Sequence, residues 1–237
     1  MIDFDRHGDL WLPSRRLYRP RLCSFQGGEA MLMGGSGITV TQLGGAQNLA
    51  SGTNFSTTAD SPAGNCIIAI LRTNLTGTAS AVNDSAGNTY ALADSSVGGG
   101  NGTHLYFYYC ANALHLPSGG TINATTTQNY NAIVISVSRL TATPLDKTGN
   151  TAFGTATSTS VATGVLTQAT EFILGAVNTG ADPGARTEAA GFTSNANSSI
   201  GQHSAYKIVN ATSAVTYAPS WVNSVTFATD VISFKGS

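Results

Sequence analysis

Residue types that could support catalysis or ion binding are sparse in this sequence. A serine nucleophile would need a strained turn such as Gly-x-Ser-x-Gly, but Gly34-Gly35-Ser36-Gly37 has a different spacing and no helical pattern follows it. We interpret that segment as a linker. His104, Cys110 and His115 are neighbours in sequence, yet the chain contains no Cys-x-x-Cys pair of the kind that binds zinc. We therefore expect no catalytic serine and no zinc site.

Carboxylates offer a second route to chemistry, because glycoside hydrolysis needs two carboxyl groups about 5–10 Å apart in a cleft. Most candidates fall in expected turns, where Asp is favoured because it caps the backbone. These candidates are Asp84, Asp94, Asp146, Asp182, Glu188 and Asp230. Asp230 is the exception, since it lies within an expected strand and points away from Phe227 and Val231. Calcium held by Asp84 and Asn88 is an alternative, although a turn there needs no ion. We predict no catalytic, cofactor-binding or metal-binding residues and no cofactor.

The composition indicates a globular all-β protein. Only 10% of the 237 residues are charged, and the formal net charge is −1. Disordered chains are usually rich in charge and poor in apolar runs, whereas apolar runs are dense here. Thr, Ser, Asn and Gly are abundant, as expected for short strands joined by tight turns. A near-neutral chain gives no overall reason to expect nucleic acid as a partner.

The cysteines and the hydropathy profile bear on disulfide bonding, secretion and membrane insertion. Cys66 and Cys110 lie inside apolar runs, where a thiol behaves as a small apolar group. With Cys23 they make an odd and sparse set, so we predict buried, unpaired thiols. Met1–Trp11 is charged and lacks the apolar stretch of a signal peptide. No run reaches the ~20 apolar residues of a membrane span, so we expect no membrane partner.

Residues 1–37 differ from the rest of the chain. They hold five of the eleven basic residues and four of the twelve acidic ones, and aromatic side chains are interleaved with these charges. Pro13 and Pro20 prevent a long helix. We predict an extended N-terminal arm that is ordered by another surface. Its predicted partner-binding residues are Trp11, Arg15, Arg16, Leu17, Tyr18, Arg19, Arg21 and Phe25. Arg, Trp and Tyr are typical of interface hot spots.

Two alternatives for the arm stay open. It could form a strand and loop that pack on the same domain. Its arginines could also bind nucleic acid, although Asp3, Asp5 and Asp9 lie among them and disfavour phosphate contacts.

Residues 38–237 have the pattern of an antiparallel β-sandwich domain. Three stretches are apolar on both faces and are expected to be central strands: Asn65–Arg72, Gln128–Leu140 and Thr170–Thr179. In His104–Cys110, Leu105, Phe107 and Tyr109 share one face. Tyr106 and Tyr108 share the other face, with hydroxyls expected to reach solvent or a partner. Strands recur about every ten residues, which is typical of sandwiches.

Shorter segments complete this pattern. Asp84–Asn88 is expected to form the turn of a hairpin, and Leu140–Thr151 to cross between sheets. Ala214–Trp221 and Val225–Lys235 are expected to be separate strands.

The order of segments in this pattern is repeated within the chain. Asn65–Leu140 and Glu171–Lys235 show the same order of central, turn, aromatic and closing segments, with His203 placed like His104. Two sheet-building halves of this kind are typical of jelly rolls. We therefore predict an all-β, jelly-roll-like antiparallel β-sandwich preceded by the arm.

Three segments carry a resemblance to a known class of protein. They are VNDSAGNTYALA, SAYKIVNATSAVTYAPSW and FATDVISFKG, within roughly Asn54–Lys235. They resemble a β-sandwich domain of bacteriophage virion proteins and some bacterial surface proteins. The resemblance implies a non-enzymatic phage structural protein, in first place a capsid decoration or cement protein anchored by its arm. A head or tail fibre role is a variant of the same expectation.

The partners implied by this resemblance are a major capsid protein or another virion protein. A homo-oligomer is expected, because a shell offers symmetric sites. The location implied is the capsid surface of a virion assembled from proteins made in the host cytoplasm.

The alternative function is carbohydrate binding by an adhesin-type sandwich. Sugar recognition uses exposed aromatic rings beside polar groups. Tyr106, Tyr108, Tyr217 and Trp221 are the candidates for glycan or oligomer contact.

Overall fold

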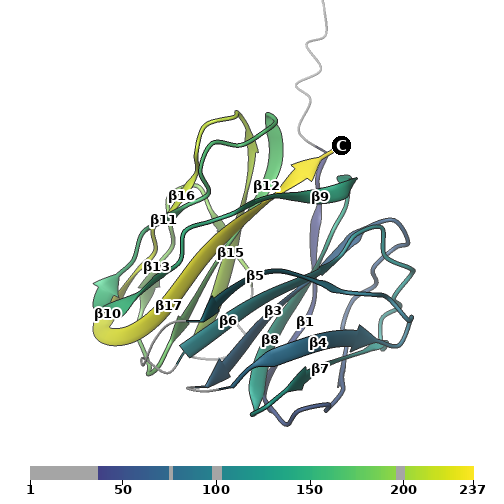
Figure 1. The fold of residues 1–237 in the computed structure, drawn as a ribbon, viewed down its shortest axis with the longest axis horizontal. Helices are drawn as coiled ribbons and strands as arrows, with labels where there is room; N and C mark the ends of the chain where they lie inside the picture. Colours follow the sequence, from purple (N-terminus) through teal and green to yellow (C-terminus); the bar gives the residue numbers. More distant parts are fainter. Residues whose placement is uncertain (1–36, 75–76, 98–102, 196–200) are drawn as a thin grey trace, which may run out of the picture. The chain divides into compact units, whose positions relative to one another are not determined.

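The computed structural model describes residues 37–74, 77–97, 103–195 and 201–237, and these belong to one compact unit. Within these ranges the regular structure consists of β-strands, and the strand pairs are antiparallel (Figure 1). The predicted all-β antiparallel sandwich is confirmed. The described part of the chain contains no helix that could cross a membrane.

The first half of the described chain forms one large sheet and one small sheet. The large sheet has the order β1-β8-β3-β6-β5, and the small sheet has the order β2-β7-β4. The large-sheet strands are β1 (Val40–Leu49), β8 (Tyr130–Val137), β3 (Cys66–Asn74), β6 (Thr103–Cys110) and β5 (Ala91–Val97). The small-sheet strands are β2 (Phe55–Ser56), β7 (Thr121–Thr126) and β4 (Ala79–Asp84).

The second half repeats this organisation. Its large sheet has the order β10-β17-β12-β15-β14, and β11 pairs with β16 in a small sheet. β9 and β13 also pair with β17. The bounds are β9 (Leu140–Thr148), β10 (Ala152–Ser158), β11 (Val161–Ala162), β12 (Thr170–Thr179), β13 (Arg186–Thr187), β14 (Thr193–Ser194), β15 (Gln202–Asn210), β16 (Thr216–Tyr217) and β17 (Ser220–Gly236).

Both halves have the strand order of a jelly roll. In β1–β8 the first, eighth, third and sixth strands are neighbours, and the second and seventh pair separately. In β10–β17, counted from β10, the same positions pair in the same way. These are the pairings that two Greek keys produce in a jelly roll. The structure therefore contains two jelly rolls in tandem, with β9 as an addition to the second.

The strand registers of the two halves agree as well. Ile68 on β3 lies between Tyr109 of β6 and Ile135 of β8. Phe172 on β12 lies between Ile208 of β15 and Phe234 of β17. In both cases the two flanking residues are 26 positions apart in sequence. The repeated order of segments in the sequence is thus a repeat of topology and of register.

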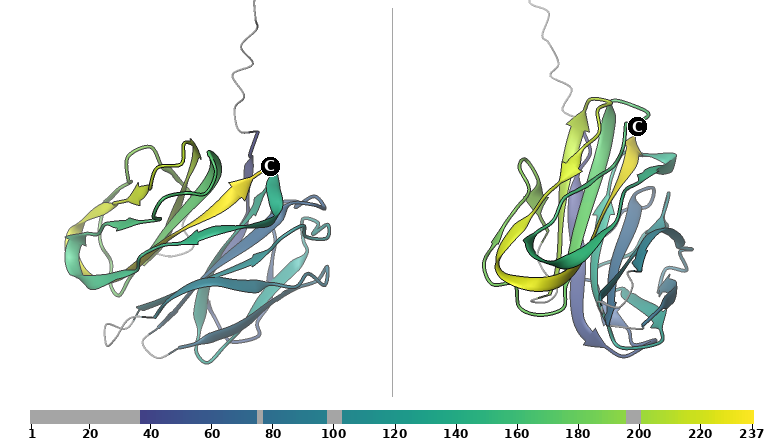
Figure 2. Two further views of the ribbon diagram at one scale, coloured as in Figure 1. Left: turned by 45° about the horizontal axis from the view of Figure 1, so that its top comes forward. Right: turned by 60° about the vertical axis from the view of Figure 1, so that its left-hand side comes forward.

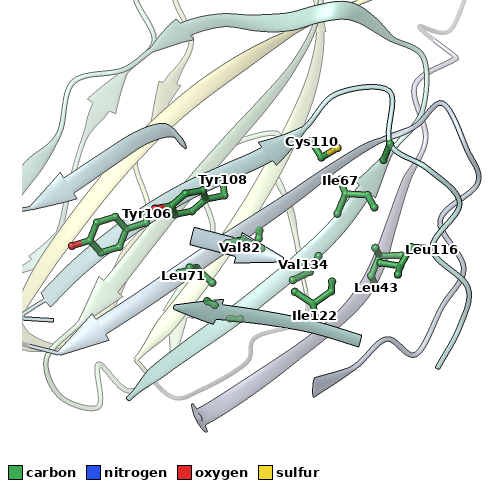
Figure 3. Packing of buried hydrophobic residues seen from close by; sticks show 14 of the residues in the cluster. Leu43, Ile67, Leu71, Val82, Tyr106, Tyr108, Cys110, Leu116, Ile122 and Val134 are labelled. Carbon is green, nitrogen blue, oxygen red and sulfur yellow. The ribbon is translucent and has the colours of Figure 1, made fainter. Parts of the chain in front are cut away.

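The two large sheets pack against each other and, with the small sheet outside each of them, give the unit formed by the described residues four layers. The central layer of contacts is apolar and includes Ile68, Phe107, Ile135, Phe172 and Phe234. A second cluster lies between the first large sheet and its small sheet (Figure 3), and a third covers the outer face of the second large sheet. In Figure 2 the two halves are seen side by side. Complete burial of one large apolar side chain contributes about 1.5–3 kcal/mol, so these clusters dominate stability.

This layering explains why the central strands are apolar on both faces. β8 is buried along its whole length, and so is β12 except at its first residue. Both are covered by a sheet on one side and by an outer layer on the other, so neither face can be polar. Strands nearer the surface, such as β4 and β10, alternate between covered and exposed residues. The three predicted central strands are confirmed as β3, β8 and β12.

Two boundaries differ from those expected. Leu140–Thr151, expected as a crossing segment, contains the strand β9, which pairs with the edge of β17 around Pro144. Pro is compatible with this position because an edge strand leaves some N–H groups unpaired. Ala214–Trp221 and Val225–Lys235, expected as separate strands, both contribute to β17, while only Thr216–Tyr217 forms β16. β17 is longer than the sequence suggests because different strands pair with its two ends.

Candidate functional site

The predicted arm lies almost entirely outside the described residues. Its candidate partner-binding residues are Trp11, Arg15, Arg16, Leu17, Tyr18, Arg19, Arg21 and Phe25. The role of each stays a prediction. Ser36 and Cys23 also lie outside the described residues.

Tyr106 and Tyr108, the first two aromatic candidates, are buried. Each is 4% exposed, and both pack between the first large sheet and its small sheet (Figure 3). The Tyr106 hydroxyl donates to the Gly77 carbonyl at 3.1 Å, and the Tyr108 hydroxyl donates to the Ala79 carbonyl at 3.0 Å. The expectation that these hydroxyls reach solvent or a partner is wrong. The small sheet covers this face of β6, and the backbone at the start of β4 and just before it supplies the acceptors.

Tyr217 and Trp221, the other two candidates, are also interior residues. They are 0% and 5% exposed. The Tyr217 ring packs beside Phe192, with ring centroids 5.1 Å apart, and the Trp221 indole N–H donates to the Ala156 carbonyl at 2.9 Å. None of the four rings is available for stacking on a sugar. The carbohydrate-binding alternative therefore has no aromatic surface at the positions predicted for it.

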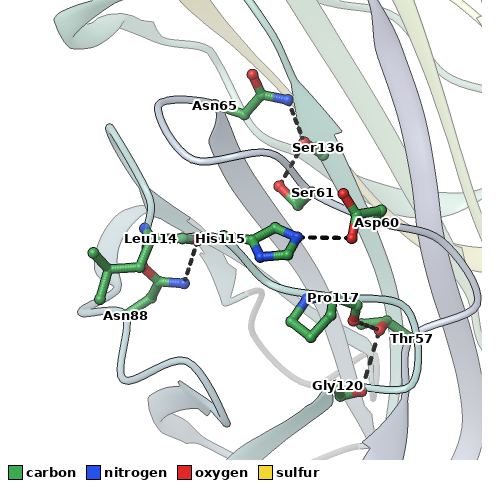
Figure 4. A network of polar contacts seen from close by, with 10 residues as sticks. All are labelled: Thr57, Asp60, Ser61, Asn65, Asn88, Leu114, His115, Pro117, Gly120 and Ser136. Atoms are coloured by element: carbon green, nitrogen blue, oxygen red, sulfur yellow. Dashed lines mark hydrogen bonds and ion pairs between the residues drawn. The ribbon is translucent and has the colours of Figure 1, made fainter.

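The histidines and cysteines considered for zinc are engaged separately. His104 Nδ1 lies 2.9 Å from the Gly77 carbonyl, whereas His115 Nε2 lies 2.8 Å from Asp60 Oδ1 in an exposed pair (Figure 4). Cys66 and Cys110 are buried and unpaired, as predicted, and burial raises the pKa of both thiols. The structure does not bring His104, Cys110 and His115, the three residues considered for zinc, together as a metal site.

Figure 4 also shows why Asp60 and His115 do not form a catalytic triad with the adjacent serine. Ser61 is fully buried, and its hydroxyl bonds to the Ser136 hydroxyl at 2.8 Å. Asn65 donates to the same Ser136 oxygen at 2.9 Å. This network ties the loop before β3 to β8, so Ser61 serves in packing and cannot reach a substrate.

The Asp84 turn completes its own hydrogen bonding. Asp84 accepts from the N–H groups of Ala86 and Asn88, from the Asn88 side-chain amide at 2.8 Å and from the Tyr90 hydroxyl at 2.8 Å. Gly87 has a φ of 78°, which glycine adopts without strain. The predicted turn is confirmed, and four protein donors already satisfy the carboxylate proposed as a calcium ligand.

A buried acid–base pair lies on the outer face of the second large sheet. His203 Nε2 and the Glu188 carboxylate form a short hydrogen bond between largely buried side chains. Burial opposes ionisation of Glu188, but the hydrogen bond and charge of His203 hold its pKa below the usual range. Arg186 and the buried Tyr217 hydroxyl lie close enough to affect these charges. The pair links the segment after β13 to the start of β15.

Two neighbouring carboxyl groups, Asp146 on β9 and Glu171 on β12, lie at the junction of these strands. Thr167 donates to Asp146 through its N–H at 2.9 Å and through its hydroxyl. Burial, together with the adjacent Asp146, raises the pKa of Glu171 to about 7, while the hydrogen bonds to Asp146 lower the pKa of that carboxyl. The Glu171 carboxyl therefore titrates near neutral pH, with its pKa at about 7. Because Glu171 is 0% exposed, the arrangement anchors β9 and does not present a reaction site.

The unusual polar region of the molecule lies at one end of the interface between the two large sheets. The apolar contacts there give way to side chains that bond to the backbone of the opposite sheet. Gln202 donates to the Ile70 carbonyl at 3.0 Å, and Arg72 donates to the Thr179 carbonyl at 3.3 Å. Asn178 reaches the His104 carbonyl at 3.5 Å. We call this region the polar end of the interface.

Asp230 and Asp94 meet at this polar end. Asp230 on β17 is 0% exposed, whereas Asp94 on β5 is half-buried at the edge of the sheet. Burial, and then the nearby charge of Asp94, raise the pKa of Asp230 to about 8. Burial also raises the pKa of Asp94, against the effect of the Ser95 N–H that donates to it. Asp230, the in-strand carboxylate of the sequence, does have an ionisable neighbour.

Several buried oxygens at this polar end have no hydrogen-bond partner in the part of the chain that the structure describes. They are Asp230 Oδ2, Asn178 Oδ1, Thr103 Oγ1 and Ser96 Oγ, and all four residues are at most 1% exposed. A buried polar group without a partner costs about 1–3 kcal/mol. Sequence reasoning singled out Asp230 but missed the other three, because Ser, Thr and Asn are common throughout the chain and only the packing of the sheets groups them.

Within the described ranges, no three His, Cys, Asp or Glu side chains gather as a metal site. Any ion at the polar end would therefore depend on neutral oxygens as well as on the two carboxylates. Comparison with protein-family models, curated proteins and solved structures finds no match for this chain.

Proposed function

We propose that this chain is a non-enzymatic structural protein of a virion, attached to the capsid exterior through residues 1–37. The body would act as a rigid decoration, and the arm would supply the attachment. The proposal rests on the resemblance of three segments to phage virion sandwiches and on the unequal composition of the chain. It is independent of the polar end of the interface.

The observation that carries the proposal is the concentration of recognition residues ahead of the sandwich. Five of the eleven Lys and Arg residues lie in the first 37 positions, together with Trp11 and Tyr18. Of the six basic residues of the body, only Arg139 is exposed, and the other five are half-buried. Aromatic and Arg side chains dominate the binding energy of protein interfaces, so the arm is the better-equipped surface.

The state of the described body is consistent with a structural role. Groups that the sequence analysis considered for chemistry take part in internal contacts, as His104 does with the Gly77 carbonyl and Asp84 with its own turn. The two jelly rolls are joined through a buried apolar interface and so form one continuous body. Protomers arranged by the symmetry of a shell would gain avidity through multivalency.

Removal of the arm tests the proposal. A chain lacking Met1–Gly34 should fold, with unchanged β-type circular dichroism, but should no longer co-sediment with shells that lack this protein. The reciprocal experiment fuses Met1–Gly37 to an unrelated soluble protein, which should then co-sediment. Shell binding by the truncated chain, or no transfer of binding by the fused arm, would rule the assignment out.

A finer test separates aromatic anchoring from charge attraction. Trp11→Ala should lower shell affinity at all salt concentrations, because it removes apolar contact. Arg16→Ala should lower it mainly at low salt, because exposed charges are screened as ionic strength rises. Val222→Ala, at a position that is 67% exposed on the body, is the matched control and should leave binding unchanged.

A further inference from the structure

The oxygens without partners at the polar end of the interface come from both large sheets. Ser96 and Thr103 belong to β5 and β6, and Asn178 and Asp230 belong to β12 and β17. Each residue is at least 99% buried, and each has a side-chain oxygen without a hydrogen-bond partner among the described residues. These oxygens are therefore a property of the interface and not of one strand.

Strand register places each pair on one face of its sheet. Ser96 lies opposite Leu105 on β6, so Thr103, two residues before Leu105, is its diagonal neighbour. Asp230 lies opposite Ala176 on β12, so Asn178 is its diagonal neighbour. Leu105 and Ala176 both belong to the apolar cluster between the large sheets. All four side chains consequently point into that interface, because alternate residues share a face.

Two observations bring the pairs together across the interface. Asn178 reaches the His104 carbonyl, which is adjacent to Thr103. Asp94, two residues before Ser96 on the same face of β5, is near enough to Asp230 for its charge to act there. Asp94 is half-buried at the sheet edge, so it gives this set of oxygens an opening to solvent.

The chemistry of the set is uniform. It offers carboxylate oxygens from Asp230 and Asp94, an amide oxygen from Asn178 and a hydroxyl oxygen from Ser96. Thr103 lies farther along the interface, beside Gly180, and is not part of the set. Hard cations are bound by such mixtures of carboxylate, carbonyl and hydroxyl oxygens, and Ca²⁺ tolerates irregular sets of six to eight. Two carboxylates would balance one divalent charge. Mg²⁺ demands near-octahedral geometry and keeps several waters, which fits a buried protein-built set less well.

We propose that Asp230, Asn178 and Ser96, with Asp94 at the rim, bind a calcium ion between the two large sheets. The ion would link the two jelly rolls and satisfy oxygens that the protein leaves unpaired. It would act as a structural bond between the halves and is independent of the proposed attachment to a shell.

Thermal unfolding of the full chain, stripped with EGTA, tests the proposal. Addition of millimolar CaCl₂ should raise the Tm by about 5 °C in a saturable way, because an ion that binds only the folded state stabilises it by mass action. The same concentration of MgCl₂ should give a smaller shift. Isothermal titration calorimetry of the wild-type chain with CaCl₂ should show one site per chain.

Three variants locate the site. Asp230→Asn should abolish the calcium-dependent rise in Tm, and Asp94→Asn should weaken calcium affinity about tenfold as expected for a rim ligand. Asp60→Asn is the matched control, because Asp60 is an exposed carboxylate paired with His115 elsewhere in the first half. Its calcium response should equal that of the wild type.

Two results would overturn the proposal. One is a wild-type chain with neither a calcium-dependent Tm nor heat of binding, which would mean that Asp230 is simply a neutral buried carboxyl. The other is an undiminished calcium response in Asp230→Asn. Should Asp230→Asn fail to fold, Ser96→Ala serves in its place: it removes a single hydroxyl and should lower calcium affinity by calorimetry, and an unchanged affinity would count against the site.

Discussion

The two jelly rolls share topology and register. They differ in the origin of the aromatic rings between the large sheet and the outer layer, which come from the large sheet in the first half and from the outer layer in the second. When His104 is matched with His203, Tyr106 and Tyr108 of β6 correspond to Ala205 and Lys207 of β15. In the first half the large rings project outward from the large sheet. In the second half the matching positions carry Ala205 and a lysine, and the rings come from the outer layer, as Phe192 and Tyr217.

The neighbouring strand compensates for this exchange. Leu71 pairs with Tyr106 in the first half, and Gly175 pairs with Ala205 in the second. A Cβ at Gly175 would lie 2.4 Å from Cγ of Tyr217, so only glycine leaves room for that ring. The large side chains of this layer therefore occupy different positions in the two halves, and Gly175 on the facing strand makes room for the Tyr217 ring in the second half. Interiors are close-packed, and complementary changes on facing elements satisfy that requirement.

Truncation of a ring should have the largest effect and should be equal in the two halves. Tyr108→Ala and Tyr217→Ala each leave a cavity in an outer layer and should lower the free energy of unfolding by about 3–5 kcal/mol. Urea denaturation followed by circular dichroism measures the change. A loss below 1 kcal/mol for one variant alone would show that the two outer layers are not equivalent.

Gly175→Ala should have the next largest effect. The added methyl group meets the Tyr217 ring, so the free energy of unfolding should fall by about 3 kcal/mol, at the upper end of overpacking costs. In a Tyr217→Ala background the same substitution should cost much less, and a double-mutant cycle would report that coupling. Additive losses would show that Tyr217 is not the group that excludes a side chain at residue 175.

A smaller, pH-dependent effect should distinguish the second half. Glu171 occupies the position matched by Ile67 in the first half, and its pKa is raised to about 7 beside Asp146. The folded state therefore retains a proton that the unfolded state loses above about pH 4.5, so this contribution is present at low pH and disappears as pH rises to 7. Glu171→Gln should flatten that decline and be about 2 kcal/mol more stable than wild type at pH 8.

The difference between wild type and Glu171→Gln isolates this group. Asp230, whose pKa is also raised, titrates in an overlapping range but is common to both chains. Urea denaturation at pH 5, 6, 7 and 8 provides the comparison. Parallel stability curves for the two proteins would mean that the pKa of Glu171 is not raised in the folded state.

The sequence predicted most of the strands because their patterns are local. Runs such as Asn65–Arg72 and Thr170–Thr179 are apolar on both faces, and this property requires coverage on both sides. Even the repeat between the halves was visible as a similar order of segments. The register match was not, because spacing differs in the loops and only strand pairing reveals which residues correspond.

The candidate site was far less predictable. Asp230 stood out because a carboxylate within a strand is unusual, but Asp94 was grouped with the turn residues until the structure placed it on β5. The tyrosine hydroxyls were expected outside because alternation identifies the two faces of a strand without showing that a small sheet covers the second one. Such information depends on contacts between segments far apart in the chain.

The position of β8 and β17 in their sheets has a consequence for synthesis on the ribosome. Each is the last strand of its jelly roll, yet each lies between strands made much earlier, so β1 and β3 stay apart until β8 arrives, and β10 and β12 until β17 arrives. Neither jelly roll can close gradually from its beginning. The nascent protein should resist protease in two steps, once after residue 137 has left the exit tunnel and again after residue 236.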